Sequence, residues 1–203
     1  MKVLSILVVT MMVAVGSVAA APSSPQKMRP YAGIGIIFLP INGSEPGEPL
    51  PLYEEPAFFR QGDLNRAKIP AFDWIFGTSP VAQPLIVMAR KGAWLRVAYD
   101  DAGREAWLNP PRQVAFQGWD LFFKGHVSRL LPGLQKKYYQ VYQQPGTSPV
   151  ATLTPMQPFK VLQLENGWAM VLIEQNSLGW LRWQDEDGRL LIGIVTDTGV
   201  RQL

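Results

Sequence analysis

The stretch that decides the fold is YYQVYQQPGTSPVATLTPMQPFKVLQLENGWAMVLIEQNSLGWLRW, residues 138–183. Short apolar runs alternate in it with turn residues, including a Pro-Gly pair, a Thr-Pro pair and an Asn-Gly pair. Strands this short, closely spaced and separated by Gly, Pro and Asn, predict a small β-barrel or sandwich. We expect five strands, at residues 140–144, 150–153, 159–164, 168–173 and 179–183.

The same pattern occurs earlier in the chain, which indicates an internal repeat. Two tryptophans, Trp94 and Trp107, are separated by almost the same interval as Trp168 and Trp180, and that interval is typical of a β-hairpin. The first copy is longer between its tyrosine and its first tryptophan, so we place an insertion within residues 58–84. The parallel segments are LYEEP (52–56) with VYQQP (141–145), KGAWLRV (91–97) with ENGWAMV (165–171), and EAWL (105–108) with LGWL (178–181).

The repeated segments GAW (92–94), AWL (106–108), NGW (166–168) and LGWL (178–181) resemble the bacterial SH3-like (SH3b) family. The second copy is more similar to the family than the first, which departs from its pattern at the insertion. The resemblance implies a mostly β fold, made of two tandem SH3-like small β-barrels. It also implies binding, often to cell-wall peptidoglycan or to protein partners, rather than catalysis.

The region between the copies is rich in aromatic residues, so we expect it to pack between the domains as a rigid connector rather than to act as a tether. It should contain a short helix near residues 119–124 and a strand near 126–131. Near the N-terminus, residues 34–39 predict a buried strand. A last strand at 189–195 should either complete the second barrel or pair with this N-terminal strand. The expected organisation is a signal peptide at 1–20, a disordered N-terminus of the mature chain at 21–30, a first SH3-like domain at 31–112, the connector at 113–134 and a second SH3-like domain at 135–203.

The N-terminus predicts export. Lys2 precedes an apolar run at residues 6–15, and small residues then lead to a cleavage site after Ala20. The apolar run is too short for a transmembrane helix, although a retained N-terminal anchor is the alternative. We therefore expect a periplasmic or secreted protein without a membrane span in the mature form. The chain has 0 cysteines, so its fold rests on buried apolar surface rather than on disulfides.

Composition and motifs argue against several classes of function. A net charge of +3 is too small and too evenly spread to predict a nucleic-acid partner. His126 is the single histidine, and no cysteine is present, so we predict no metal site, no cofactor and no catalytic residues. The acidic pairs at 100–101 and 185–187 are explained by turns. A wall hydrolase that uses paired carboxylates is a third alternative.

The aromatic residues of the repeat are the candidate ligand-binding residues. An indole or phenol face offers a flat apolar surface to a sugar or a proline, although packing of the barrels explains the same positions. The candidates are Tyr53, Trp94, Trp107, Tyr142, Trp168, Trp180 and Trp183.

We therefore expect a non-catalytic binding module of the bacterial envelope whose partner is peptidoglycan or an envelope protein. The alternative is a structural or assembly subunit that uses the insertion and the connector as a protein interface. Within the insertion, the apolar segment IPAFDWIFG (69–77) either forms that interface or folds back over its own barrel. The sequence leaves the oligomeric state open.

Overall fold

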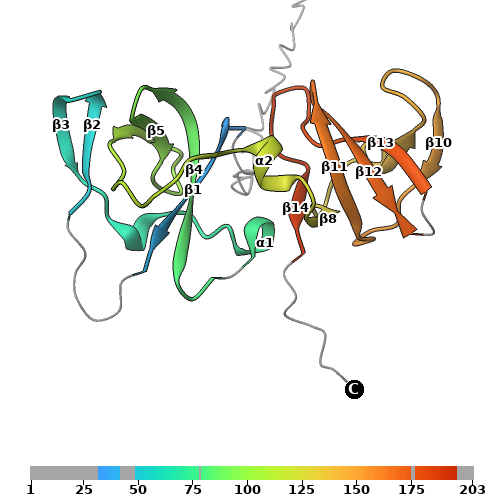
Figure 1. The fold of residues 1–203 in the computed structure, drawn as a ribbon, viewed down its shortest axis with the longest axis horizontal. Coiled ribbons are helices and arrows are strands. Elements are labelled where there is room, and N and C mark those ends of the chain that lie inside the picture. The colour runs from blue at the N-terminus through green and yellow to red at the C-terminus, as the bar shows by residue number, and fades with distance from the viewer. Residues whose placement is uncertain (1–31, 42–48, 78, 175–176, 196–203) are drawn as a thin grey trace, which may run out of the picture.

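A computed structural model describes residues 32–41, 49–77, 79–174 and 177–195 (Figure 1). The predicted signal peptide (1–20) and N-terminal tail (21–30) lie outside these residues, as do two turn residues at 175–176. None of the helices in the described part of the chain combines the length and the apolar character that crossing a bilayer requires.

The chain is mostly β, and its strands form two antiparallel sheets of seven strands each. The first sheet has the order β3-β2-β6-β5-β4-β1-β7. Its strands are β1 (Gly35–Pro40), β2 (Pro51–Glu55), β3 (Phe58–Asp63), β4 (Ala82–Lys91), β5 (Trp94–Ala98), β6 (Glu105–Leu108) and β7 (Gln117–Gly118).

The second sheet has the order β10-β9-β13-β12-β11-β8-β14. Its strands β9 to β13 confirm the five strands expected from the sequence, with bounds that shift by a few residues at most. The strands are β8 (Val127–Leu130), β9 (Gln140–Tyr142), β10 (Pro149–Thr152), β11 (Phe159–Glu165), β12 (Trp168–Ile173), β13 (Ser177–Arg182) and β14 (Ile192–Ile194).

Corresponding strands occupy the same places in both sheets, which confirms the internal repeat. The structure extends this repeat to a strand at each end, since β1 corresponds to β8 and β7 corresponds to β14. Of the two pairings considered for the last strand, the structure has the first, because β14 pairs with β8. Within the described residues the end strands of each sheet do not pair with one another, so the pairing follows an open order rather than a closed ring.

Short helices connect the strands. The first half has extra chain between β3 and β4, where η1 (Arg66–Lys68) and α1 (Asp73–Phe76) lie. The expected helix in the connector is confirmed as α2 (Trp119–Phe123), and η2 (Lys136–Tyr139) precedes β9. The strand expected after α2 is also confirmed, and β8 joins the second sheet through β11 and β14.

The Asn-Gly pair of the second copy forms the tight turn that its sequence predicts. Glu165 and Trp168 are register partners, and only Asn166 and Gly167 lie between them. Both turn residues have positive φ, 46° and 79°. A two-residue hairpin loop of type I′ requires this geometry, which Asn and Gly adopt at low cost.

Two clusters of buried side chains form the core, and one of them extends across both halves. In β1, Ile36 packs in the cluster that holds the second sheet, while its neighbour Ile37 packs in the cluster of the first sheet. In β4, Ile86 likewise packs in the cluster that extends to the second sheet, and Leu85 packs in the cluster of the first sheet. Both faces of these strands are buried, which explains why residues 36–39 are continuously apolar instead of alternating.

Helices α1 and α2 lie between the two sheets (Figure 1). Helix α1 lies directly against β14 at Gly193, where an added Cβ atom would be 2.8 Å from the carbonyl oxygen of Ile75. Trp119 of α2 donates from its indole nitrogen to the carbonyl oxygen of Gly33 at 2.9 Å. Helix α2 of the connector therefore packs against β1 of the first sheet and also contacts β11 of the second.

The apolar segment at 69–77 folds back into the protein. Ile69 is buried in the core cluster of the first sheet. Phe72, Ile75 and Phe76 are buried in the other core cluster, which extends to the second sheet. Its remaining large side chain, Trp74, is 40% exposed. The segment therefore packs inward, as one of the two alternatives had it, but most of its buried side chains lie between the halves and not over its own sheet.

Candidate functional site

The first sheet carries an aromatic cluster on the face opposite its core. On β5 the buried Leu95 points into the core, so the neighbouring Trp94 points to the other face by the two-residue period of a strand. Tyr53 of β2 is the register partner of Trp107 in β6. The ring of Tyr53 also meets Trp94 edge-on, with ring centroids 5.2 Å apart. We call Tyr53, Trp94 and Trp107 the first aromatic face.

An arginine lies on this face. Arg96 is the register partner of Trp107, and its guanidinium carbon lies 5.9 Å from the centroid of that ring. Its Nε is 3.1 Å from a carboxylate oxygen of Glu105. Trp107 is only 9% exposed, whereas Tyr53 and Trp94 are half-buried.

The second sheet repeats the arrangement. Tyr142 of β9 is the register partner of Trp180 in β13, and its ring meets Trp168 of β12 edge-on at 5.1 Å. Gly179 permits this, because a Cβ atom there would overlap Cγ1 of Val141 in β9. We call Tyr142, Trp168 and Trp180 the second aromatic face, and all three are half-buried.

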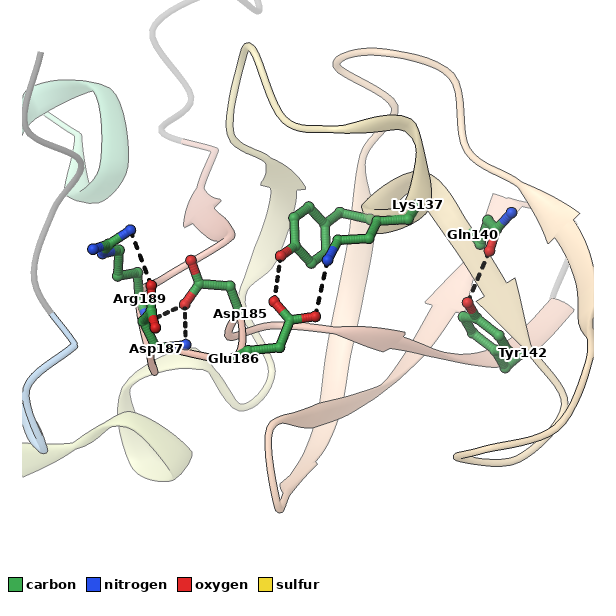
Figure 2. A network of polar contacts seen from close by, with 8 residues as sticks. Lys137, Gln140, Tyr142, Asp185, Glu186, Asp187 and Arg189 are labelled. Carbon is green, nitrogen blue, oxygen red and sulfur yellow. Dashed lines mark hydrogen bonds and ion pairs between the residues drawn. The ribbon is translucent and has the colours of Figure 1, made fainter. Parts of the chain in front are cut away.

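An arginine also contacts the second aromatic face, but from a different strand. Arg182 of β13 is the register partner of Trp168, and its guanidinium carbon lies 4.6 Å from the ring. Met170 is the partner of Trp180 and takes the place that an arginine holds in the first sheet. The hydroxyl of Tyr142 donates to Gln140 at 2.8 Å (Figure 2), which fixes the orientation of the phenol.

The seventh candidate, Trp183, lies elsewhere. It is 7% exposed and belongs to the core cluster that both halves share, where its ring centroid is 6.3 Å from that of Phe123. Trp180 and Trp183 are separated by an odd number of positions, so alternation directs them to opposite sides. The structure thus brings six of the candidates together as two trios and separates Trp183 from them. The sequence analysis did not identify Arg96 and Arg182. Each is the register partner of a tryptophan, so a correct strand register would have identified them.

Acidic residues near the second sheet are engaged in structural contacts. Glu186 accepts hydrogen bonds from the Tyr138 hydroxyl at 2.6 Å and from the Lys137 ammonium at 2.9 Å (Figure 2). These two hydrogen bonds lower the pKa of Glu186 to about 2, and the bond from Tyr138 has the larger effect. Asp185 accepts backbone hydrogen bonds from Asp187 and Arg189, which confirms the turn expected there. This network ties η2 to the segment between β13 and β14.

The acidic pair of the first sheet also makes a turn, as expected. Asp100 accepts from the backbone nitrogen of Arg104 at 3.0 Å and from its Nε at 2.6 Å. Burial by itself raises the pKa of Asp100, but the hydrogen bonds from Arg104 outweigh it and hold the pKa below its usual value. Within the described ranges no group of three His, Cys, Asp or Glu side chains is arranged to hold a metal ion. His126 is exposed and stacks on Phe122.

The chemistry that the aromatic faces offer is binding. Edge-to-face packing holds Tyr53 against Trp94 and Tyr142 against Trp168 in one orientation, so little side-chain entropy is lost when a ligand stacks on these rings. Arg182 adds a cation next to the flat apolar surface of the second face, where it can meet a ligand carboxylate, whereas Arg96 on the first face is paired with Glu105.

No protein-family model matches the chain. No curated protein matches it either. Among solved structures, it is similar to NlpC2 from Trichomonas vaginalis, with 11% identity and a TM-score of 0.28, over 78% of this chain. The chain spans 48% of that protein's length. It is also similar to the structure named "Endolysin LysPBC5 CBD", with 15% identity and a TM-score of 0.25, over 82% of this chain and 98% of the other.

Proposed function

We propose that this protein is an exported, non-catalytic binding module of the bacterial envelope that binds peptidoglycan through its aromatic faces. The observation that carries this proposal is the recurrence of one Tyr-Trp-Trp trio on corresponding strands of two sheets, in which the tyrosine and the first tryptophan are half-buried in both copies. An arginine lies over one indole of each trio. We further propose that each half is a variant of the SH3-like domain, supported by the shared strand order and the repeated Gly-Trp hairpins.

The position of the rings supports binding over packing. Both sheets already bury a core on their inner side, through residues such as Leu95 and Ala169. Trp94 and Trp168 start the strands that carry these residues and lie on the opposite side, half-exposed. An indole that served only to fill the core would be placed on the inner side, as Trp183 is.

The side chains suit a polymer of sugars and short peptides. Aromatic faces stack against the C–H surface of a sugar ring, and Arg182 supplies donors for carboxylates along the polymer. Two faces on one chain would also bind a long polymer more tightly than either alone, because the second contact is intramolecular.

The test is co-sedimentation of residues 21–203 with purified peptidoglycan sacculi across a salt series. We expect retention that survives high salt, since stacking is screened less than charge pairing. Trp168→Ala should reduce retention strongly. Trp74→Ala is the matched control, because Trp74 is an exposed indole outside both faces and its loss should leave retention unchanged.

Two outcomes would contradict the proposal. One is the absence of retention, and the other is equal retention by wild type and a folded Trp168→Ala variant. Retention that disappears with salt would assign binding to dispersed basic side chains instead. Release of soluble wall fragments during the incubation would replace binding alone by hydrolysis.

One observation favours the second candidate function, an assembly subunit. Phe58 and Phe59 begin the edge strand β3 and are 66% and 75% exposed. Phe59 has a φ of 55°, an uncommon conformation for a bulky residue, which presents its ring to solvent. Adjacent exposed rings on an unpaired strand edge are typical of a protein interface. Light scattering after gel filtration tests this, because Phe59→Ser should convert any oligomer to a monomer, and a monomeric wild type would exclude self-assembly.

A further inference from the structure

We propose that a groove beside the β4–β5 hairpin binds a carboxylate carried on a small apolar body, such as the C-terminus of a short peptide. The groove has a volume of about 480 Å³, within the range of small-ligand sites. It lies between the hairpin and the loop that follows β6. The lining residues on which the argument depends are Arg90, Leu95, Arg112, Val114 and Phe116.

Arg90 is held in a fixed orientation at this groove. Its guanidinium carbon lies 5.6 Å from the centroid of the Phe116 ring, and its Nε donates to the carbonyl oxygen of Gly92 at 3.1 Å. Within the described ranges the terminal nitrogens of Arg90 make no hydrogen bond or ion pair. These two nitrogens form the flat pair of donors that matches the two oxygens of a carboxylate.

The charge of the groove selects an anion. Arg90 and Arg112 both line it, and none of the lining residues in the described chain is acidic. Other arginines of the first sheet have carboxylate partners, as Arg60 has Asp63 at 2.7 Å and Arg96 has Glu105 at 3.1 Å. Among the described residues neither arginine of the groove has such a partner, so the groove keeps a local positive charge that attracts a ligand carboxylate.

The apolar part of the lining selects what carries the carboxylate. Leu95 and Val114 are buried and contribute atoms to the lining, and Phe116 is half-buried beside them. Pro110 and Pro111 complete an apolar wall. A bare inorganic anion would leave this surface in water, whereas a compact aliphatic side chain would cover it. The combination therefore fits an acylated amino acid better than phosphate.

The groove is a property of the first half and does not depend on the wall-binding proposal. In the second sheet Leu164 and Ala169 are register partners, as Arg90 and Leu95 are in the first. The corresponding position therefore carries a leucine in place of the arginine. The groove is also distinct from the first aromatic face, since Leu95 and Trp94 point to opposite sides of β5.

The experiment is an NMR titration of ¹⁵N-labelled protein (residues 21–203) with N-acetyl-leucine. N-acetyl-leucinamide, which has the same apolar body but no charge, is titrated as the control ligand. We expect saturable shifts for the Arg90 Nε–H and for the backbone amides of Gly92 and Phe116. Arg90→Gln should weaken binding at least about tenfold, because it removes a charge-assisted pair of hydrogen bonds. Arg112→Gln should weaken it less, and it provides a second variant if the first does not fold. Arg60→Gln is the matched control and should leave binding unchanged.

Each of four results would overturn the proposal. The first is no saturable shift at the groove. The second is equally tight binding of N-acetyl-leucinamide, which would mean that the groove binds the apolar body and does not recognise the carboxylate. The third is an equal loss in Arg60→Gln, which would indicate general charge attraction. The fourth is binding of inorganic phosphate as tight as that of N-acetyl-leucine, which would leave an anion site without selection for the apolar body.

Discussion

Replacing Ile75 by alanine tests whether the two sheets form one cooperative unit. Ile75 lies on α1, which the chain inserts between β3 and β4 of the first half, and its side chain is 0% exposed. It packs in the cluster that contains Ile192 of the second sheet. The substitution removes buried carbon atoms worth about 0.8 kcal/mol each and leaves a cavity, so the expected loss is about 2–5 kcal/mol.

The assay is thermal and denaturant unfolding, read by circular dichroism. For a chain of this size each kcal/mol lowers the midpoint by about 2–4 °C, which predicts a fall of about 4–20 °C. Leu121→Ala is the control, because Leu121 is 65% exposed on α2 and its loss should change stability by no more than about 0.5 kcal/mol. Hydrogen exchange should also show weaker protection of the β14 amides at Ile192 and Ile194.

Two results would refute this reasoning. A loss below about 1 kcal/mol would mean that Ile75 is not packed as the structure has it. Weaker protection confined to the first sheet, with the amides of β14 unchanged, would mean that α1 does not couple the halves. A second unfolding transition in the wild type would lead to the same conclusion, because a single cooperative unit unfolds in one step.

Three further predictions concern the contacts that hold the halves and turns. Gly193→Ala should destabilise the protein by about 1–3 kcal/mol in denaturant unfolding, because the new Cβ would lie 2.8 Å from the carbonyl oxygen of Ile75; an unchanged midpoint would contradict that close approach. The pKa of Glu186 is lowered to about 2, so its stabilising contribution is fully present above its ordinary value near 4.5 and is lost as the pH falls toward 2. Glu186→Gln should therefore flatten this part of the stability–pH curve, and a curve parallel to that of the wild type would exclude the role. Asp100→Ala should cost about 1–3 kcal/mol, since the bonds from Arg104 at 3.0 and 2.6 Å are lost from a buried turn, and a thermal midpoint equal to that of the wild type would count against it.

The packing of the halves has a consequence for binding. If α1 and α2 hold the sheets in one arrangement, the two aromatic faces keep a fixed separation. A fixed separation favours a stiff, repetitive polymer, because both contacts can form without ordering a linker. It disfavours small soluble ligands, which gain nothing from a second site.

Local chemistry made the strands predictable. In residues 138–183 the turn residues and the length of the apolar runs are enough to place five strands, and Asn166 with Gly167 specifies its own turn through positive φ. The short helix at α2 and the strand at β8 were also predictable, since each is a separate apolar run beside a breaker. Such features depend on neighbours in the chain, and the sequence contains those neighbours.

The trios of the candidate site were predictable as a set of residues, and their grouping was not. The repeated spacing identified Tyr142, Trp168 and Trp180, but the approach of a tyrosine on one strand to tryptophans on two others depends on strand order. Arg182 remained hidden because the register of β12 and β13 decides which ring it covers.

The sequence by itself determined that the chain is mostly β and repeated, because strand length, turns and alternation are local properties of the backbone. Only the tertiary structure decided that Ile75 packs against the last strand, that Trp183 lies in the core and that Arg90 faces a groove. These outcomes depend on which distant surfaces meet, and many apolar surfaces in this chain are similar enough to pair in more than one way. The choice among them is made by close packing over the whole protein, as at Gly193, where the absence of one methyl group allows a helix and a strand to touch.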